Sequence, residues 1–262
     1  MIRVASVQLE ISGGETKDER VDRVAREVGS MRGTDLVLLP EVWNVGYFNF
    51  DRYATEAEPL DGRTVTRLGE AARSAGAWVL VGSIIEGSEG RLFNTSVLLD
   101  RGGEVRASYR KIHLFGYGSR EHELLARGGQ PAVADTELGR IGLATCYDLR
   151  FPELFRAMVD DGAELFLVTS AWPYPRVEAW TMLNRVRAHE NLAWLISANC
   201  AGGDPVPCCG RSMIVDPWGT AVAAAGDRPA VLTAEIDPAA AAAARADFPA
   251  LRDRVFETGR MR

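Results

Sequence analysis

The chain has 262 residues, of which 47% are apolar and 25% charged, and a formal net charge of -6. This composition is typical of a folded globular protein and argues against disorder of the whole chain. The acidic balance argues against a nucleic-acid partner, because phosphate contacts require clustered Lys and Arg.

The N-terminal segment reads as a strand, Ile2–Leu9, and not as a basic stretch followed by an apolar run. We therefore expect no signal peptide and a cytoplasmic protein. Apolar runs stay strand-sized, below the roughly 18 residues that predict a membrane span. The four cysteines are then expected as reduced thiols. Cys208 and Cys209 are adjacent, but with three histidines and no second cysteine pair we expect no metal site.

Hydrophobic periodicity divides the first half of the chain into alternating strands and helices. One helix is predicted at Lys17–Met31, where several valines fall on one face. A second helix is predicted at Gly62–Ala75. Strands are predicted at Ile2–Leu9, Asp35–Leu39, Trp78–Ile84, Leu92–Leu99 and Val105–Tyr109. Residues 113–130 show no clear period and receive no element.

The second half of the chain continues with two helices, Pro152–Val159 and Val177–Glu190, and an Ala-rich segment, Pro238–Ala246. Strands are predicted at Ala132–Asp135, Ile141–Thr145, Leu165–Thr169, Trp194–Asn199, Arg211–Val215, Ala221–Ala224 and Val231–Ile236. Several strands follow one another through tight turns, and no repeat or linker-like run interrupts the chain. We therefore expect one domain, residues 1–262, with an α/β layered fold whose helices pack outside the sheets.

Glu41 is the first of three candidate catalytic residues, each placed where a predicted strand ends. It follows the strand Asp35–Leu39 and Pro40. Sites in α/β folds are commonly built at such a rim. Desolvation there raises the pKa of a carboxylate and makes it a usable general base. Taken alone, the segment is more typical of a solvated loop glutamate.

Lys111 is the second candidate and follows the strand Val105–Tyr109. A buried lysine is costly without a partner or a purpose, and a cation at the end of a strand can stabilise an oxyanion. The ordinary alternative is a basic pair that flanks an edge strand.

Cys146 is the third candidate, at an abrupt change from the strand Ile141–Thr145 to the helix Pro152–Val159. This arrangement is typical of the strand–nucleophile–helix elbow of hydrolases. We expect the helix N-terminus to lower the pKa of the thiol, and the backbone N–H of Tyr147 to face an acyl oxygen bound at Cys146. A buried structural cysteine is the commoner alternative, and that role is expected for the other three.

Three short blocks together resemble the signatures of the nitrilase superfamily, the carbon–nitrogen hydrolases. They are Leu39-Pro40-Glu41, Arg110-Lys111-Ile112-His113-Leu114 and the segment from Thr145 to Glu153, in the family's order and at its separations. The similarity extends to the segments from Arg187 to Asn191 and from Gly210 to Gly219, and so covers nearly the whole chain. Three signatures in order are far more specific than one.

The resemblance implies a four-layer α-β-β-α sandwich that assembles into homodimers or larger homo-oligomers. It implies Glu41 as general base, Lys111 as oxyanion stabiliser and Cys146 as nucleophile, and it implies no cofactor. It also implies a second glutamate shortly before a glycine, which selects Glu121, with Glu123 as the weaker candidate.

The C-terminal tail, about residues 248–262, is expected at a subunit interface. It carries Leu251, Val255, Phe256 and Met261 without a strong repeat of its own. Docking on a partner subunit would bury these apolar side chains.

Among the reactions of the superfamily, the sequence favours hydrolysis of amides. Nitrilases usually read Cys-Trp-Glu at the nucleophile, whereas this chain reads Cys146-Tyr147-Asp148, similar to the amidase branches. We expect a small linear carboxamide to be cleaved to a carboxylic acid and ammonia through a thioester. Arg150 and Arg120 near the expected entrance favour an ω-amide of a dicarboxylic acid. The alternatives on the same site are hydrolysis of N-carbamoyl amino acids or amines, and a nitrilase reaction.

Three residues are expected to bind substrate: Tyr147, Arg150 and Trp172. Arg150 has two interpretations. Its planar fork could grip a substrate carboxylate, or it could anchor its helix by pairing with Glu153 or Glu190.

Two alternatives belong to a different class of protein. The first is a non-catalytic member that binds a metabolite, which the presence of all three catalytic residues disfavours. The second is a thiol redox sensor, which requires a resolving cysteine such as Cys200 close to Cys146.

Overall fold

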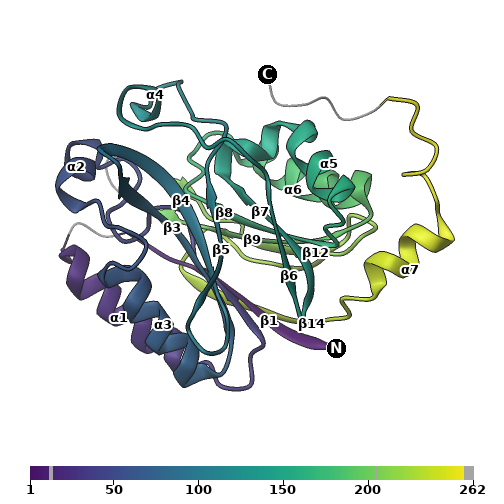
Figure 1. Cartoon of the computed structure of the whole chain (residues 1–262), viewed down its shortest axis with the longest axis horizontal. Helices are drawn as coiled ribbons and strands as arrows, with labels where there is room; N and C mark the ends of the chain where they lie inside the picture. The colour runs from purple at the N-terminus through teal and green to yellow at the C-terminus, as the bar shows by residue number, and fades with distance from the viewer. Residues whose placement is uncertain (12–13, 204–205, 257–262) are drawn as a thin grey trace.

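Two six-stranded sheets lie face to face in the computed structural model, which describes residues 1–11, 14–203 and 206–256 (Figure 1). The first sheet has the order β14 (Ala230–Ile236), β1 (Ile2–Gln8), β2 (Leu36–Leu38), β3 (Trp78–Ser88), β4 (Arg91–Leu99) and β5 (Val105–Arg110). The second has the order β13 (Ala221–Ala224), β12 (Met213–Val215), β9 (Trp194–Asn199), β8 (Leu165–Ser170), β7 (Gly139–Thr145) and β6 (Ala132–Thr136). A short pair, β10 (Ala201–Gly202) and β11 (Cys208–Cys209), stands apart.

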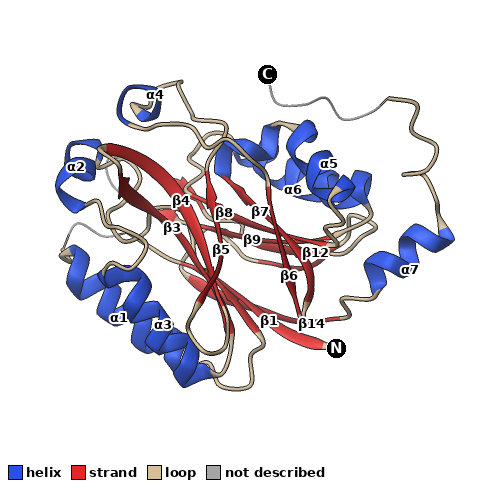
Figure 2. Ribbon diagram, in the orientation of Figure 1, coloured by secondary structure: helices blue, strands red, loops and turns tan. Residues whose placement is uncertain are grey.

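Helices cover the outer face of each sheet (Figure 2). The first sheet carries α1 (Lys17–Gly29) and α3 (Arg63–Ala75), and the second carries α5 (Pro152–Asp160) and α6 (Val177–Asn191). This arrangement confirms the four-layer α-β-β-α sandwich. The remaining helical elements are η1 (Phe50–Arg52), α2 (Tyr53–Glu56), α4 (Glu121–Leu124), η2 (Cys146–Arg150) and α7 (Ala240–Asp247).

The apolar run of β2 follows from its place in the middle layers. Leu36 and Leu38 pack into the core between the two sheets, whereas Val37 packs against α1 and α3. Side chains alternate along a strand, so a strand covered on both faces is apolar at every position.

A bulge in β3 fixes the chain just before Glu41. Gly82 has a φ of 79°, and a Cβ at this position would lie 1.9 Å from the carbonyl oxygen of Pro40. The absent side chain lets Ser83 donate its backbone N–H to Pro40 and accept the N–H of Val42. The exit from β2 is therefore held by the neighbouring strand, which positions Glu41.

The structure differs from the sequence prediction mainly at element ends and short turns. β12 begins at Met213 and not at Arg211, because Arg211 takes a left-handed φ of 58°. The unassigned segment 113–130 contains the four-residue helix α4. The Ala-rich segment forms α7, in keeping with the high helix propensity of alanine. In the described ranges, no helix has the length and apolar character needed to cross a membrane.

Candidate active site

Strand ends from both sheets bring the three candidate residues together. Glu41 follows β2 and Lys111 follows β5 in the first sheet, whereas Cys146 follows β7 in the second. All three side chains are buried. The sequence prediction that each lies just beyond a strand is confirmed.

A network of charge-assisted hydrogen bonds joins two carboxylates to one ammonium group. Lys111 Nζ lies 2.9 Å from Glu41 Oε1 and 3.0 Å from each carboxylate oxygen of Glu121. The backbone N–H of Ala171 donates to Glu41 Oε2 at 2.9 Å, and that of Phe115 donates to Glu121 Oε2 at 2.6 Å. The site therefore holds Glu121, as predicted, and every carboxylate oxygen in it has a donor.

Glu123, the weaker candidate for the second glutamate, lies outside this network. It is exposed and forms an ion pair with Arg120. Gly128 explains part of the difference, because a Cβ there would lie 1.9 Å from the carbonyl oxygen of Arg110. Its N–H donates to the carbonyl of Lys111, and this close approach draws the loop over Lys111.

Asn94 on β4 also belongs to the network, although the sequence analysis did not select it. Its side-chain nitrogen donates to Glu41 Oε1 at 2.8 Å and to Glu121 Oε1 at 3.1 Å. The sequence could have pointed to Asn94 through the run of polar residues Asn94-Thr95-Ser96 inside a largely apolar strand. Such residues need buried partners.

The electrostatics of the network favour a charged lysine. Burial alone would lower the pKa of Lys111, but the negative charges of Glu121 and Glu41 hold this pKa well above its ordinary value. Burial raises the pKa of Glu121, and the nearby charge of Lys111 opposes that shift. The single ammonium group of Lys111 therefore pairs with the carboxylates of both Glu41 and Glu121.

Cys146 has a φ of 48° and only 7% of its surface exposed, at a sharp turn between β7 and η2. Burial raises the pKa of the Cys146 thiol well above its ordinary value, and the charge of Glu41 adds to this rise. The expectation that a helix N-terminus would lower this pKa is wrong. The residues after Cys146 form a single 3-10 turn, and α5 begins only at Pro152. A thiol that stays protonated needs a base, and Glu41 lies near enough for its charge to raise the pKa of Cys146.

Asp148 braces the turn that carries Cys146. It accepts hydrogen bonds from the Tyr109 hydroxyl at 2.7 Å and from the Thr145 N–H at 2.9 Å. Its other oxygen lies 2.7 Å from His113 Nδ1, and the His113 ring stacks on Phe151. His113 thus helps to hold this turn in place.

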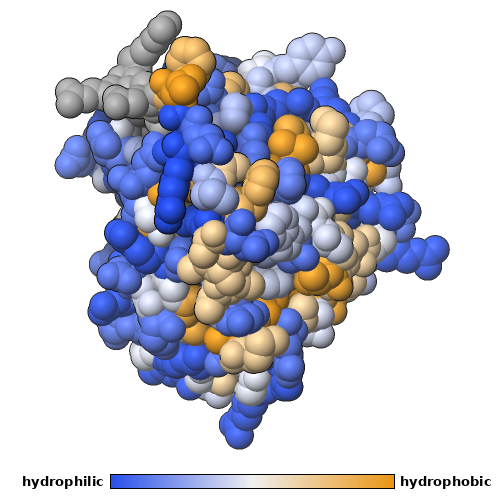
Figure 3. Space-filling model, turned by 90° about the vertical axis from the view of Figure 1, so that its right-hand side faces the viewer, coloured by the Kyte–Doolittle hydropathy of each residue, from blue (hydrophilic) through white to orange (hydrophobic). Residues whose placement is uncertain are grey.

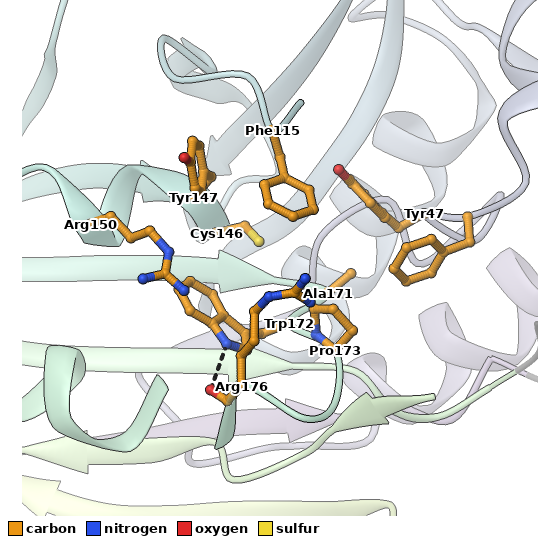
Figure 4. Close-up of a pocket in the computed structure, with 10 residues that line it drawn as sticks. Tyr47, Phe115, Cys146, Tyr147, Arg150, Ala171, Trp172, Pro173 and Arg176 are labelled. Carbon is orange, nitrogen blue, oxygen red and sulfur yellow. Dashed lines mark hydrogen bonds between the residues drawn. The ribbon is translucent and has the colours of Figure 1, made fainter. Parts of the chain in front are cut away.

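A pocket opens beside Cys146 (Figure 4). Its lining residues are Tyr47, Phe48, Phe115, Cys146, Tyr147, Arg150, Ala171, Trp172, Pro173 and Arg176. The predicted binding residues Tyr147, Arg150 and Trp172 are all in this set. A lining that is apolar apart from a few polar groups is typical of a site for a small ligand.

Two guanidinium groups border the pocket, and no carboxylate is among its lining residues. Arg150 lies over the Trp172 ring, 4.8 Å from its centroid, and Arg176 lies near the ring of Phe115. None of the ion pairs in the described part of the chain includes Arg150, and Glu190 pairs with Arg187. The pocket-facing interpretation of Arg150 is therefore the one that the geometry supports.

Arg120 does not contribute to the pocket, contrary to its expected place near the entrance. It is bound by Asp51 and Glu123 on the surface. The second pocket cation is Arg176, which the sequence analysis missed because nothing in the segment after Trp172 marks it. Its position depends on the fold, since its backbone carbonyl accepts the indole N–H of Trp172 at 2.9 Å.

The contacts of Cys200 in the described structure do not include Cys146. Its sulfur contacts the carbonyl oxygen of Glu41 and the thiol of Cys208. All four cysteines are free thiols. The described geometry thus gives no support to the redox-sensor interpretation built on Cys146 and Cys200.

Comparisons with known proteins show the family of this chain. The family model described as carbon-nitrogen hydrolase matches residues 3–246. The chain is similar to a protein from Paenarthrobacter nicotinovorans named 2-oxoglutaramate amidase, with 37% identity over 260 residues that cover 96% of this chain and 88% of that protein.

Two solved structures share the fold. One is XC1258 from Xanthomonas campestris, a CN-hydrolase superfamily protein with an arsenic adduct in its active site, with a TM-score of 0.89 and 31% identity over 98% of this chain and 99% of that one. The other is a mutant of the amidase from Nesterenkonia sp. AN1 that shows Michael addition of acrylamide at its active site cysteine. It has a TM-score of 0.83 and 28% identity, with 96% of this chain and 100% of that chain covered. The chain belongs to the carbon–nitrogen hydrolase family, within the nitrilase superfamily, and is a hydrolase of non-peptide carbon–nitrogen bonds.

Proposed function

We propose that the protein hydrolyses a small linear carboxamide that carries a carboxylate at its far end, an ω-amide of a dicarboxylic acid. One observation carries this proposal: a small apolar pocket places two guanidinium groups, Arg150 and Arg176, around the thiol of Cys146. The relative named 2-oxoglutaramate amidase acts, by its name, on an amide of this class.

The reaction proceeds in two halves. In the first, Cys146 Sγ attacks the amide carbonyl while Glu41 takes the thiol proton. Glu41 then returns this proton to the leaving nitrogen, the carbon–nitrogen bond breaks and ammonia departs. A thioester remains on Cys146. In the second half, Glu41 takes a proton from water, the resulting oxygen nucleophile attacks the thioester, and the acid leaves as the thiol is restored.

Lys111 stabilises the charge that develops on the carbonyl oxygen in each half. Its ammonium group is buried, charged and fixed by Glu41 and Glu121, so it does not have to reorganise as the reaction proceeds. The backbone N–H of Tyr147 is the second donor in this proposal. Glu121 acts by holding Lys111 in place.

Arg150 and Arg176 would recognise the far carboxylate. A guanidinium group donates in a planar fork that matches a carboxylate. Neither guanidinium group forms an ion pair in the described structure, and both lie near aromatic rings, so an incoming carboxylate displaces no ion-pair partner. Trp172 supports this end of the pocket, since Arg150 rests on its ring.

We also propose that residues 1–262 form one domain that works in the cytoplasm as a homodimer or larger homo-oligomer. The four free thiols suit a reducing compartment. Exposed apolar side chains of the tail, Phe248, Val255 and Phe256, support an interface there. Residues 257–262, with Met261, lie outside the described residues.

An ammonia-release screen tests the proposed function. Succinamate, 2-oxoglutaramate, butanamide, an N-carbamoyl amino acid and a small nitrile are offered to the purified enzyme at equal concentration. The proposal predicts the highest kcat/KM for the two ω-amides. Faster ammonia release from the N-carbamoyl compound would favour a carbamoyl hydrolase instead, and faster release from the nitrile would favour a nitrilase. A preference for butanamide over succinamate would contradict the part of the proposal that requires a carboxylate at the far end of the substrate.

A further inference from the structure

Asn94 connects every charged group of the network that surrounds Glu41. Its side-chain nitrogen bridges Glu41 and Glu121, and its backbone carbonyl accepts the N–H of Lys111 at 2.8 Å. The side chain is buried and is absent from the pocket lining. Asn94 therefore acts on Glu41 and not on a bound ligand.

The orientation of the Asn94 amide follows from its surroundings. Two carboxylate oxygens lie within hydrogen-bonding distance of one end of the amide, so that end must be the NH2 group, because an amide oxygen there would face two acceptors. The amide oxygen at the other end is buried and has no hydrogen-bond partner in the described structure. A buried acceptor without a partner costs stability. An asparagine at this position therefore provides two N–H donors to the carboxylates at a cost in stability from its unpaired amide oxygen.

These donors divide the two oxygens of Glu41 into different roles. Oε1 accepts from Asn94 and from Lys111, which occupies both of its lone pairs. Oε2 accepts only from the N–H of Ala171 among the bonds described, and so keeps one lone pair for another proton.

We propose that Asn94 is a positioning residue that commits Oε2 of Glu41 to receive the thiol proton of Cys146. The proposal rests on the role of Glu41 as general base in the proposed function. It goes beyond that role by naming the oxygen that acts and the side chain that selects it.

The effect has a direction that can be measured. Hydrogen bonds to a carboxylate favour its charged form, so loss of both Asn94 donors should move the acidic limb of kcat/KM to higher pH. Other titratable side chains that face Glu41 stay in place in such a variant. They are Lys111 after β5, Glu121 in α4, Cys146 in η2, Tyr47 after β2, Tyr53 in α2 and Cys208 in β11.

The test compares Asn94→Leu with Asn184→Leu. Asn184 in α6 is also buried and also has an amide oxygen without a described partner, but its side-chain nitrogen donates to the backbone carbonyl of Trp180 and it lies outside the site. Asn94→Leu should lower kcat by about tenfold to a hundredfold, less than loss of the base itself, with KM nearly unchanged and the acidic limb at higher pH. Asn184→Leu should leave kcat and the pH profile as in the wild type.

Asn94→Asp provides a second variant of nearly the same shape. An ionised aspartate offers no donor and repels both glutamates, whereas a protonated one offers a single O–H. The activity of Asn94→Asp relative to Asn94→Leu should therefore rise as the pH falls. An unchanged acidic limb in Asn94→Leu, together with a pH-independent ratio between the two variants, would overturn the proposal and leave Asn94 a structural residue.

Alkylation of Cys146 by iodoacetamide separates this inference from the choice of substrate. The thiol sulfur displaces iodide and loses its proton, and peptide mass analysis identifies Cys146 as the modified site. The alkylation rate should show the same shift to higher pH in Asn94→Leu as kcat/KM does. If no ω-amide is hydrolysed, the proposed function fails but the alkylation profile still decides the role of Asn94. An unshifted alkylation profile contradicts that role whatever the substrate is.

Discussion

Lys111 Nζ lies 3.0 Å from both carboxylate oxygens of Glu121, so this second glutamate binds the ammonium group of the lysine through both oxygens. The same nitrogen reaches only one oxygen of Glu41, at 2.9 Å. This asymmetry separates the tasks of the two carboxylates. Glu121 fixes the cation, while Glu41 keeps an oxygen free for the thiol.

Glu121→Gln should lower kcat by about tenfold or more while KM changes little, because Lys111 loses a charged partner and part of its fixed geometry. Steady-state kinetics with the best amide of the screen measure this change. The matched control is Glu123→Gln, which alters an exposed glutamate two residues away that contacts only Arg120. Equal kinetics in the two variants would show that Glu121 has no special role.

Lys111→Met and Glu41→Gln should each lower kcat by about a hundredfold or more, the scale of losing an oxyanion donor or a general base. Near-normal kinetics in either variant would refute the role given to that residue. Both proteins should retain the wild-type far-UV spectrum, which shows that the loss is chemical.

The stability of Lys111→Met should also depend on pH in a defined direction. Burial raises the pKa of Glu121 above the unfolded value of about 4.3, and without the ammonium group of Lys111 nothing opposes this rise while the neighbouring Glu41 adds to it. The folded state then binds more protons than the unfolded state, so stability falls as the pH rises from about 4 toward 7. Breaking a buried ion pair costs about 3–5 kcal/mol. Thermal melts at several pH values measure the trend, and a Tm difference from wild type that does not change with pH would contradict it.

Arg150→Lys should raise KM for succinamate by about tenfold, the scale of one lost hydrogen bond between charged groups, and should leave butanamide nearly unaffected. Arg176→Lys should behave in the same way. Arg120→Ala is the control, because Arg120 is held on the surface by Asp51 and Glu123. If Arg150→Lys impairs hydrolysis of acidic and neutral amides equally and also lowers the Tm, then Arg150 is structural and does not bind the carboxylate.

The sequence predicted those parts of the structure that depend on local pattern. Strand ends could be located from apolar periodicity, so the positions of Glu41, Lys111 and Cys146 followed from it. Contacts between residues distant in the chain could not be found in this way. Asn94 is 53 residues from Glu41, and their hydrogen bond exists only because β4 and the end of β2 meet in one sheet.

Arg176 and the pKa of Cys146 illustrate the same limit. Arg176 enters the pocket because the Trp172 indole binds its carbonyl, which no periodicity encodes. The thiol pKa depends on burial and on the charge of Glu41, both of which arise from the fold, whereas the sequence pattern suggested only a helix N-terminus.

We expect a homodimer or larger assembly in solution. The side of the molecule that carries α7 and the tail shows apolar groups among polar ones (Figure 3). Two of the exposed aromatic rings, Trp218 and Phe248, lie 6.4 Å apart. Sedimentation should give at least a dimer at micromolar concentration. The double variant Trp218→Asp, Phe248→Asp should dissociate more readily than Val105→Asp, which alters a similarly exposed residue on the edge strand β5. A stable wild-type monomer would contradict the expectation.

Replacement of the proposed nucleophile gives the most direct test of the whole account. Wild type, Cys146→Ala and Cys209→Ala are mixed with the preferred ω-amide, and ammonia release is followed. Samples quenched in acid are measured by mass spectrometry, both intact and after digestion to peptides. Cys146→Ala should fold with a wild-type melting profile, release no ammonia above background and gain no mass. Wild type and Cys209→Ala should turn over and show the mass of one acyl group on the peptide that contains Cys146. Ammonia release by Cys146→Ala at the wild-type rate, or an acyl group on any other residue, would contradict the account.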